Sequence, residues 1–136
     1  MRILIIDDDP QVGNLLAEVL RARGHIPAVA RSGAEGLAAI AAQPPDAVFL
    51  DMVMPGMSGL DVLREIRRAH RDLPVLVLTG RATDEQLEEA RRLGFTDVVE
   101  KPWALTNLDA ALESLEPPAA EQDRPNPGQE SRAGNL

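Results

Sequence analysis

The sequence predicts a doubly wound α/β fold built on a five-stranded parallel sheet. Short apolar runs alternate five times with segments whose apolar residues fall at spacings of three and four, which is the pattern of a strand followed by an amphipathic helix. Parallel strands joined in this way need right-handed crossovers, which place helices on both faces of the sheet. A chain of 136 residues with 44% hydrophobic residues is long enough for one such core and too short for two ordinary domains.

Five segments are predicted as strands, four of them strongly apolar and the last one weaker. They are residues 3–6, 26–30, 47–50, 75–78 and 96–99. The first, third and fourth are apolar along their whole length, which is typical of strands covered on both sides.

The predicted helices have recognisable starts and ends. The first four begin after residues that can cap a helix N-terminus, namely Asp9 (with Pro10 following), Ser32, Ser58 and Thr83, the last with Gln86 as a capping box. Gly24 and Gly94 stand where the first and fourth helices are expected to end. The last helix is indicated by a leucine stripe, formed by Leu105, Leu108, Leu112 and Leu115.

The folded domain is expected to span residues 1–116. From Pro117 onward the sequence is rich in proline and polar residues and has almost no large apolar side chain. Such a segment cannot bury enough surface to fold, so we predict that residues 117–136 form a disordered tail and that there is no second domain.

Composition excludes several classes of function. The chain has no Cys, so disulfide scaffolds and thiolate chemistry are ruled out. A formal charge of -8 opposes binding to nucleic acid or to anionic lipid. No apolar run approaches the roughly 20 residues of a membrane span, and three consecutive aspartates interrupt the N-terminal apolar stretch where a signal peptide would continue. We therefore expect a cytoplasmic protein with neither a nucleic-acid nor a membrane partner.

Polar side chains follow four of the predicted strands. Asp7 and Asp8 come after the first, Asp51 after the third, Thr79 after the fourth and Lys101 after the fifth. Ligands of open parallel sheets bind beyond the carboxyl ends of the strands. If the strands take the flavodoxin-like order 2-1-3-4-5, the first and third are neighbours and their aspartates converge on one pocket.

Such a carboxylate cluster points to a hard cation and to phosphoryl chemistry. Two carboxylates about 4 Å apart repel by about 4 kcal/mol at an effective dielectric of 20. A cluster of this kind either raises a pKa or holds an oxygen-ligated ion, Mg²⁺ most naturally. Lys101 is the only lysine among 14 Lys and Arg residues, which suggests a site that needs a compact point charge. Together these groups would stabilise a phosphoryl group on Asp51, the predicted nucleophile.

Each residue also has an ordinary structural interpretation. Asp9 is expected to act as a helix cap rather than a ligand. Asp7 and Asp8 could be a solvated strand end, and Thr79 and Lys101, taken singly, could be a strand-end hydroxyl and a surface charge. Their joint placement at strand ends favours the functional interpretation.

At this point the chain resembles the receiver domain of bacterial two-component response regulators, of the single-domain chemotaxis-regulator type. The resemblance covers residues 1 to about 116. It rests on four motifs in order, which are Ile-Leu-Ile-Ile-Asp-Asp-Asp-Pro at 3–10, Asp-Met-Val-Met-Pro-Gly-Met-Ser-Gly-Leu at 51–60, Leu-Thr-Gly at 78–80 and Lys-Pro-Trp at 101–103.

The resemblance implies that Asp51 accepts a phosphoryl group from a phosphohistidine on a sensor histidine kinase or a histidine phosphotransfer protein, with Mg²⁺ required. It implies that Asp8, Asp51 and the backbone carbonyl of Val53 ligate the metal, while Asp7 acts mainly through a metal-bound water. Such receivers help to catalyse both their own phosphorylation and its hydrolysis, so whether the protein counts as an enzyme depends on definition.

The resemblance also implies a switch. Thr79 and Lys101 would contact phosphoryl oxygens, and the surface of the fourth helix, fifth strand and fifth helix would then repack to bind a downstream protein. One position departs from the family pattern, because Val98 stands three residues before Lys101, where an aromatic residue is usual. Arg81, two residues after Thr79, occupies a position that modulates the lifetime of the phosphorylated state.

Two alternatives remain at this stage. A phosphorylation-independent adaptor would keep the fold without the chemistry, and Val98 leaves this alternative open. An aspartyl-nucleophile phosphohydrolase of the haloacid-dehalogenase type would need a second acid two residues after Asp51, where Val53 stands.

Overall fold

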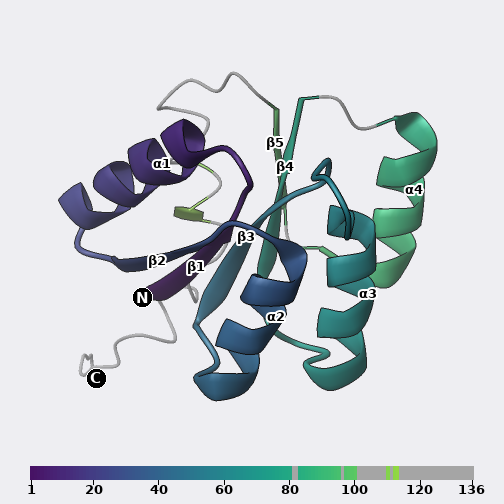
Figure 1. The fold of residues 1–136 in the computed structure, drawn as a ribbon, viewed down its shortest axis with the longest axis horizontal. Helices are drawn as coiled ribbons and strands as arrows, with labels where there is room; N and C mark the ends of the chain where they lie inside the picture. Colours follow the sequence, from purple (N-terminus) through teal and green to yellow (C-terminus); the bar gives the residue numbers. More distant parts are fainter. Residues whose placement is uncertain (81–82, 96, 101–109, 111, 114–136) are drawn as a thin grey trace, which may run out of the picture.

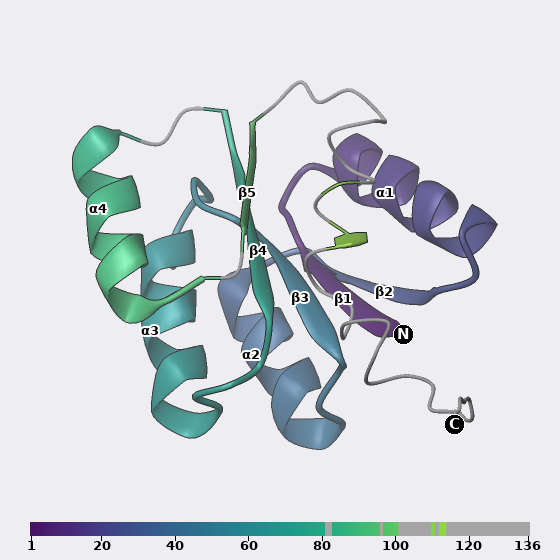
Figure 2. The same cartoon turned by 180° about the vertical axis from the view of Figure 1, so that it is seen from behind.

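Five parallel strands form one sheet with helices on both of its faces (Figures 1 and 2). The computed structural model describes residues 1–80, 83–95, 97–100, 110, 112 and 113. The strands are β1 (Arg2–Ile6), β2 (Ile26–Ala30), β3 (Ala47–Asp51), β4 (Val75–Thr79) and β5 (Asp97–Glu100). Their order in the sheet is β2-β1-β3-β4-β5, so the predicted fold class and strand order are confirmed.

Four helices connect these strands, and each begins where its capping residue was predicted. They are α1 (Pro10–Ala22), α2 (Gly33–Ala42), α3 (Gly59–Ala69) and α4 (Asp84–Leu93). The Asp9 carboxylate accepts a hydrogen bond from the Gln11 amide at 2.9 Å, and Ser32 caps α2. Capping boxes with both reciprocal bonds start α3 and α4. Local sequence therefore determines where these helices begin.

The helix ends also follow the sequence. α1 ends at Ala22 with Arg23 in the capping position, and Gly24 follows at φ +86°. Gly94 caps α4 at φ +100°. Both glycines adopt the left-handed region that side chains with a Cβ rarely occupy, which is why glycine closes these two helices.

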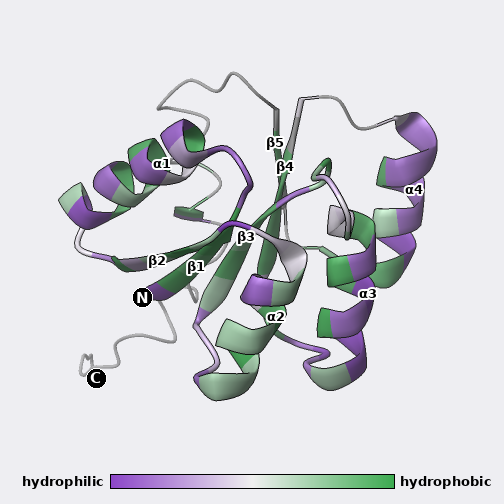
Figure 3. Cartoon of the chain, in the orientation of Figure 1, coloured by the Kyte–Doolittle hydropathy of each residue, from purple (hydrophilic) through white to green (hydrophobic). Residues whose placement is uncertain are grey.

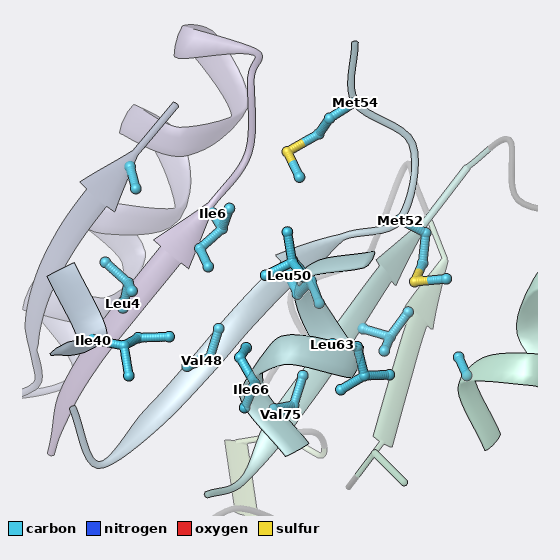
Figure 4. Close-up of a cluster of buried hydrophobic side chains, with 14 residues drawn as sticks. Leu4, Ile6, Ile40, Val48, Leu50, Met52, Met54, Leu63, Ile66 and Val75 are labelled. Atoms are coloured by element: carbon cyan, nitrogen blue, oxygen red, sulfur yellow. The ribbon is translucent and has the colours of Figure 1, made fainter. Parts of the chain in front are cut away.

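Two hydrophobic layers cover the sheet, one on each face. The layer beneath α1 contains the buried residues Ile3, Ile5, Leu16, Leu20, Phe49, Leu76 and Leu78. The layer beneath α2, α3 and α4 contains alternate residues of the same strands, including Leu4, Ile6, Val48 and Leu50, packed against Ile40, Leu63 and Ile66 (Figure 4). Apolar residues accordingly run along the strands and the inward faces of the helices (Figure 3). Burial on both faces explains why the central strands are apolar throughout.

Parts of the predicted fold lie outside the described residues. The fifth strand begins at Asp97, and Thr96 lies outside. Of the leucine stripe that indicates a fifth helix, only Leu112 is described, and it is 3% exposed in the layer beneath α1. The predicted tail at 117–136 lies outside entirely, so the domain boundary at residue 116 stays a prediction.

Candidate functional site

Three carboxylates from two separate parts of the chain meet at the carboxyl ends of β1 and β3. The two strands are neighbours, and Ile6 pairs with Leu50 in their register. Asp7 and Asp8 leave β1 directly after that pair, and Asp51 is the last residue of β3. Carboxylate oxygens of these three aspartates lie within 4.8 Å of one another. The convergence predicted from the strand order is therefore present.

Backbone amides hold two of these carboxylates in place. The Asp9 amide donates to Oδ1 of Asp7 at 3.0 Å, and the Val53 amide donates to Oδ1 of Asp51 at 3.1 Å. Asp7 is 0% exposed and Asp51 is 4% exposed, whereas Asp8 is half-buried. Both bonds arise from the turn that follows each strand, so the chain fixes the carboxylates through its backbone.

The cluster concentrates negative charge where water has little access. Two unit charges 4.8 Å apart repel by about 3.5 kcal/mol at an effective dielectric of 20. All of the donors are carboxylate oxygens, the hard ligands that Mg²⁺ and Ca²⁺ prefer and that thiophilic metals do not. The donor set therefore fits a hard divalent cation.

Gly59 belongs to the construction of the site, although its role was not predicted from the sequence. A Cβ at this position would overlap the carbonyl oxygen of Asp51 and would lie 2.5 Å from the Cα of Met52. The Gly59 amide also donates to the Met52 carbonyl at 3.1 Å. The start of α3 thus packs directly on the backbone that carries Asp51. A glycine directly after the capping serine is the only sequence signal of this contact.

The remaining predicted site residues are described in part or not at all. Val53 is half-buried in the loop after β3. Thr79 is the last residue of β4 and pairs in register with Glu100 of β5. Lys101 comes next along the chain and lies outside the described residues, as do Arg81 and Trp103. The backbone therefore brings Asp51, Thr79 and Glu100 to the same end of the sheet.

The amino-acid sequence matches a known protein family. A model of the response regulator receiver domain matches residues 3–113. This chain belongs to the response regulator receiver domains. Receiver domains of this family are modules of two-component systems, and the resemblance in the sequence is therefore confirmed.

Curated relatives of this receiver domain are longer proteins. The transcriptional regulatory protein QseB of Haemophilus influenzae is 40% identical over 115 residues, which are 85% of this chain and 52% of the relative. Response regulator MprA of Mycobacterium avium is also 40% identical, over 85% of this chain and 50% of its own length. The chain thus spans about half the length of these curated relatives.

Two solved structures share the fold of this receiver domain over nearly their whole length. Chemotaxis protein CheY4 of Vibrio cholerae superposes with a TM-score of 0.79 at 25% identity and covers 85% of this chain and 98% of its own. The receiver domain of NtrX from Brucella abortus gives a TM-score of 0.78 at 35% identity, over 83% and 96% of the two chains. Within the described part of this receiver domain, none of the helices has the length and apolar character needed to cross a bilayer.

Proposed function

We propose that this receiver domain is a Mg²⁺-dependent phospho-acceptor that takes a phosphoryl group on Asp51 and thereby switches partner binding. The observation that carries the proposal is the cluster of Asp7, Asp8 and Asp51, whose carboxylate oxygens lie within 4.8 Å. Membership of the receiver-domain family supports it. The proposed donor is a phosphohistidine on a sensor histidine kinase or a histidine phosphotransfer protein.

Asp51 would act as the nucleophile. One of its carboxylate oxygens forms a bond to phosphorus, the bond between phosphorus and the imidazole nitrogen of the donor breaks, and the electron pair of that bond stays on the imidazole. The amide of Val53, 3.1 Å from Oδ1 of Asp51, fixes the orientation of the carboxylate before the reaction. Such preorganisation lowers the cost of reaching an in-line arrangement.

Asp8 and Asp51 would hold Mg²⁺ through their carboxylates, Val53 through its backbone carbonyl, and Asp7 through a water molecule. When bound, the ion supplies positive charge that offsets the carboxylates and the phosphoryl oxygens. Burial of Asp7 and Asp51 strengthens these electrostatic interactions, because little water is present to screen them.

Thr79 and Lys101 would contact the phosphoryl group once it is attached. Glu100, the residue before Lys101 in the sequence, pairs with Thr79 at the end of the sheet where Asp51 lies, which supports this assignment. The hydroxyl of Thr79 is a hydrogen-bond donor, and the ammonium of Lys101 is a compact cation. Both kinds of group bind phosphoryl oxygens well. The downstream protein would bind the surface of α4, β5 and the predicted fifth helix, and the proposed location is the cytoplasm.

A phosphorylation-independent adaptor is a second candidate, favoured by Val98. This residue packs against the hydrophobic layer beneath α2, α3 and α4. The resemblance predicts an aromatic switch residue at this position. An adaptor would bind its partner equally well with and without the modification of Asp51.

Incubation with acetyl phosphate and Mg²⁺, followed by mass spectrometry of the intact chain, tests the proposal. The expected result is a gain of one phosphoryl group that hydroxylamine removes, with no gain in Asp51→Asn. Asp9→Asn is the matched control, because asparagine caps a helix as well as aspartate does, and it should be modified like the natural chain. An unmodified natural chain would favour the adaptor, and rapid turnover of the small phosphodonor would favour a hydrolase.

A further inference from the structure

The guanidinium of Arg67, in the last turn of α3, bonds to three backbone carbonyls, two in the segment directly after α3 and one at the end of α4. Its Nε donates to the carbonyl of Gly94 at 2.9 Å, and one terminal nitrogen donates to the carbonyls of His70 at 3.0 Å and Leu73 at 2.8 Å. His70 caps the end of α3 and Gly94 caps the end of α4. One side chain thus ties together the C-terminal ends of two helices.

Two of these carbonyls, those of His70 and Gly94, stand at helix ends and are strong acceptors. The last carbonyls of a helix have no partner within it, and they carry the negative end of the helix dipole. Hydrogen bonds to a charged donor are roughly twice as strong as those between neutral groups. Burial lowers the pKa of Arg67, while Asp72 raises it. The pKa of a guanidinium lies so far above neutral pH that Arg67 stays charged. The three hydrogen bonds therefore persist over the pH range in which the protein is folded.

The rest of α4 is packed unevenly. Thr83, Asp84 and Glu85 at its start are exposed, whereas Ala90 near its end is buried. Ala90 is the one buried residue of the helix, while α1 and α3 bury four each. The ion pair between Arg64 and Glu89 spans 3.8 Å between half-exposed side chains and contributes little. Leu87, in the first half of α4, is half-buried where it packs on the layer beneath α2, α3 and α4. The attachment of α4 is therefore strongest toward its C-terminal end.

We propose that Arg67 is a positioning residue that anchors the C-terminal end of α4, so that any displacement of the helix is a pivot about Gly94. The opposite end of α4 begins at the end of the molecule toward which β4 runs (Figures 1 and 2), which is also the end of the sheet where β1 and β3 finish at the aspartates. Only the source of the displacement, modification of Asp51, rests on the proposed function. The anchor itself is a property of the unmodified chain.

The contact needs arginine in particular. The planar fork of a guanidinium reaches carbonyls in several directions, whereas the ammonium of lysine is a point charge with a different set of donor directions. The carbonyl of Gly94 is also presented by a backbone at φ +100°, a conformation that other residues at this cap would strain.

Native-state amide hydrogen exchange of the full chain tests the anchor. We compare the natural chain with Arg67→Met, which keeps an unbranched apolar stem without the donors, and with Arg67→Lys. Arg64→Met is the matched control, since it removes a neighbouring α3 arginine. The readout is the ratio of protection in residues 90–94 to that in β1 and β3, because a loss of global stability changes both equally.

In Arg67→Met we expect this ratio to fall about tenfold, in Arg67→Lys to be partly restored, and in Arg64→Met to stay within about twofold. An unchanged ratio in Arg67→Met, or a parallel loss of protection in α4 and in the central strands, would overturn the anchor.

A second measurement reads the pivot. With Mg²⁺ and beryllofluoride, a mimic of the phosphoryl group, amide shifts in α4 should concentrate in residues 84–87 of the natural chain and should spread to residues 90–94 in Arg67→Met. Equal shifts at both ends of α4 in the natural chain would overturn the pivot. Absence of shifts throughout both proteins would count against the proposed function, whereas the exchange experiment would still decide the anchor.

Discussion

Gly59 shows how one absent side chain shapes the aspartate cluster. The first turn of α3 lies against the backbone of Asp51 and Met52, with no room for a Cβ. A glycine here lets the helix start close to the strand end, so that the loop from β3 turns sharply and Val53 can donate to Asp51. Position 59 therefore controls the geometry of the carboxylate without contributing an atom to the site.

Gly59→Ala should lower the free energy of unfolding by about 1–3 kcal/mol, because the added methyl group forces the backbone of the strand end to shift. Urea unfolding followed by circular dichroism measures this change. The comparison is Gly56→Asn, a position at φ +76° with open space around its Cβ, where asparagine tolerates the conformation and the loss should stay below about 1 kcal/mol. Equal stability of Gly59→Ala and the natural chain would contradict the close approach.

At the residue scale, sequence reasoning found the groups with chemical character and missed those that act through shape or backbone. The aspartates were predictable because carboxylates at the ends of neighbouring parallel strands must converge. Gly59 and Arg67 were not, because one acts by lacking a side chain and the other bonds to carbonyls whose meeting depends on packing. The contacts of Thr79 and Lys101 with phosphoryl oxygens stay a prediction.

At the scale of elements, the edge strand β2 carries a proline that opposes pairing with a strand of another molecule. The Ile26 amide donates to the Met1 carbonyl, and the Ala30 carbonyl accepts from the Asp7 amide, so these alternate residues of β2 direct their backbone groups toward β1. The backbone groups of Pro27 and Val29 consequently point to the outer edge of the sheet, away from β1. Because proline has no N–H, the outer edge lacks one of its donors, which opposes pairing with another strand.

Pro27→Val should therefore promote association through the edge of β2. Valine restores the outward N–H and raises strand propensity, so light scattering should show an average mass that rises with protein concentration. Ala28→Val adds a similar side chain to the same strand, but the N–H of residue 28 already faces β1, so this variant should remain at the mass of the natural chain. A constant mass for Pro27→Val would show that the proline does not protect the edge.

The elements themselves were the most predictable part of the structure. Caps at Asp9, Ser32, Ser58 and Thr83 lie where the sequence placed them, because capping is a local interaction within four residues. The last helix was expected from its leucine stripe, of which Leu112 is described and buried. The uneven attachment of α4 could not be predicted, since it depends on which neighbours cover each turn.

At the scale of the whole molecule, the alternation of strand and helix determines the architecture, because right-handed crossovers leave few ways to arrange five parallel strands. The strand order puts β1 and β3 side by side and so creates the aspartate cluster. The domain boundary at residue 116 is predicted from composition alone.

Removal of residues 117–136 should leave the stability of the domain unchanged to within about 0.5 kcal/mol, because a segment without large apolar residues has little surface to bury. Thermal unfolding of the chain ending at residue 116 measures this. A clear fall in the midpoint temperature would show that the tail packs on the domain, and the boundary would then be wrong.

Isothermal titration of Mg²⁺ into the purified chain tests the central claim most directly, namely that Asp7, Asp8 and Asp51 form a divalent cation site. We expect a single saturable binding event in the natural chain and in Asp9→Asn, and its loss or a large weakening in Asp51→Asn, which removes one charge while keeping an acceptor for the Val53 amide. Absence of saturable binding in the natural chain, or equal binding by Asp51→Asn, would contradict the account.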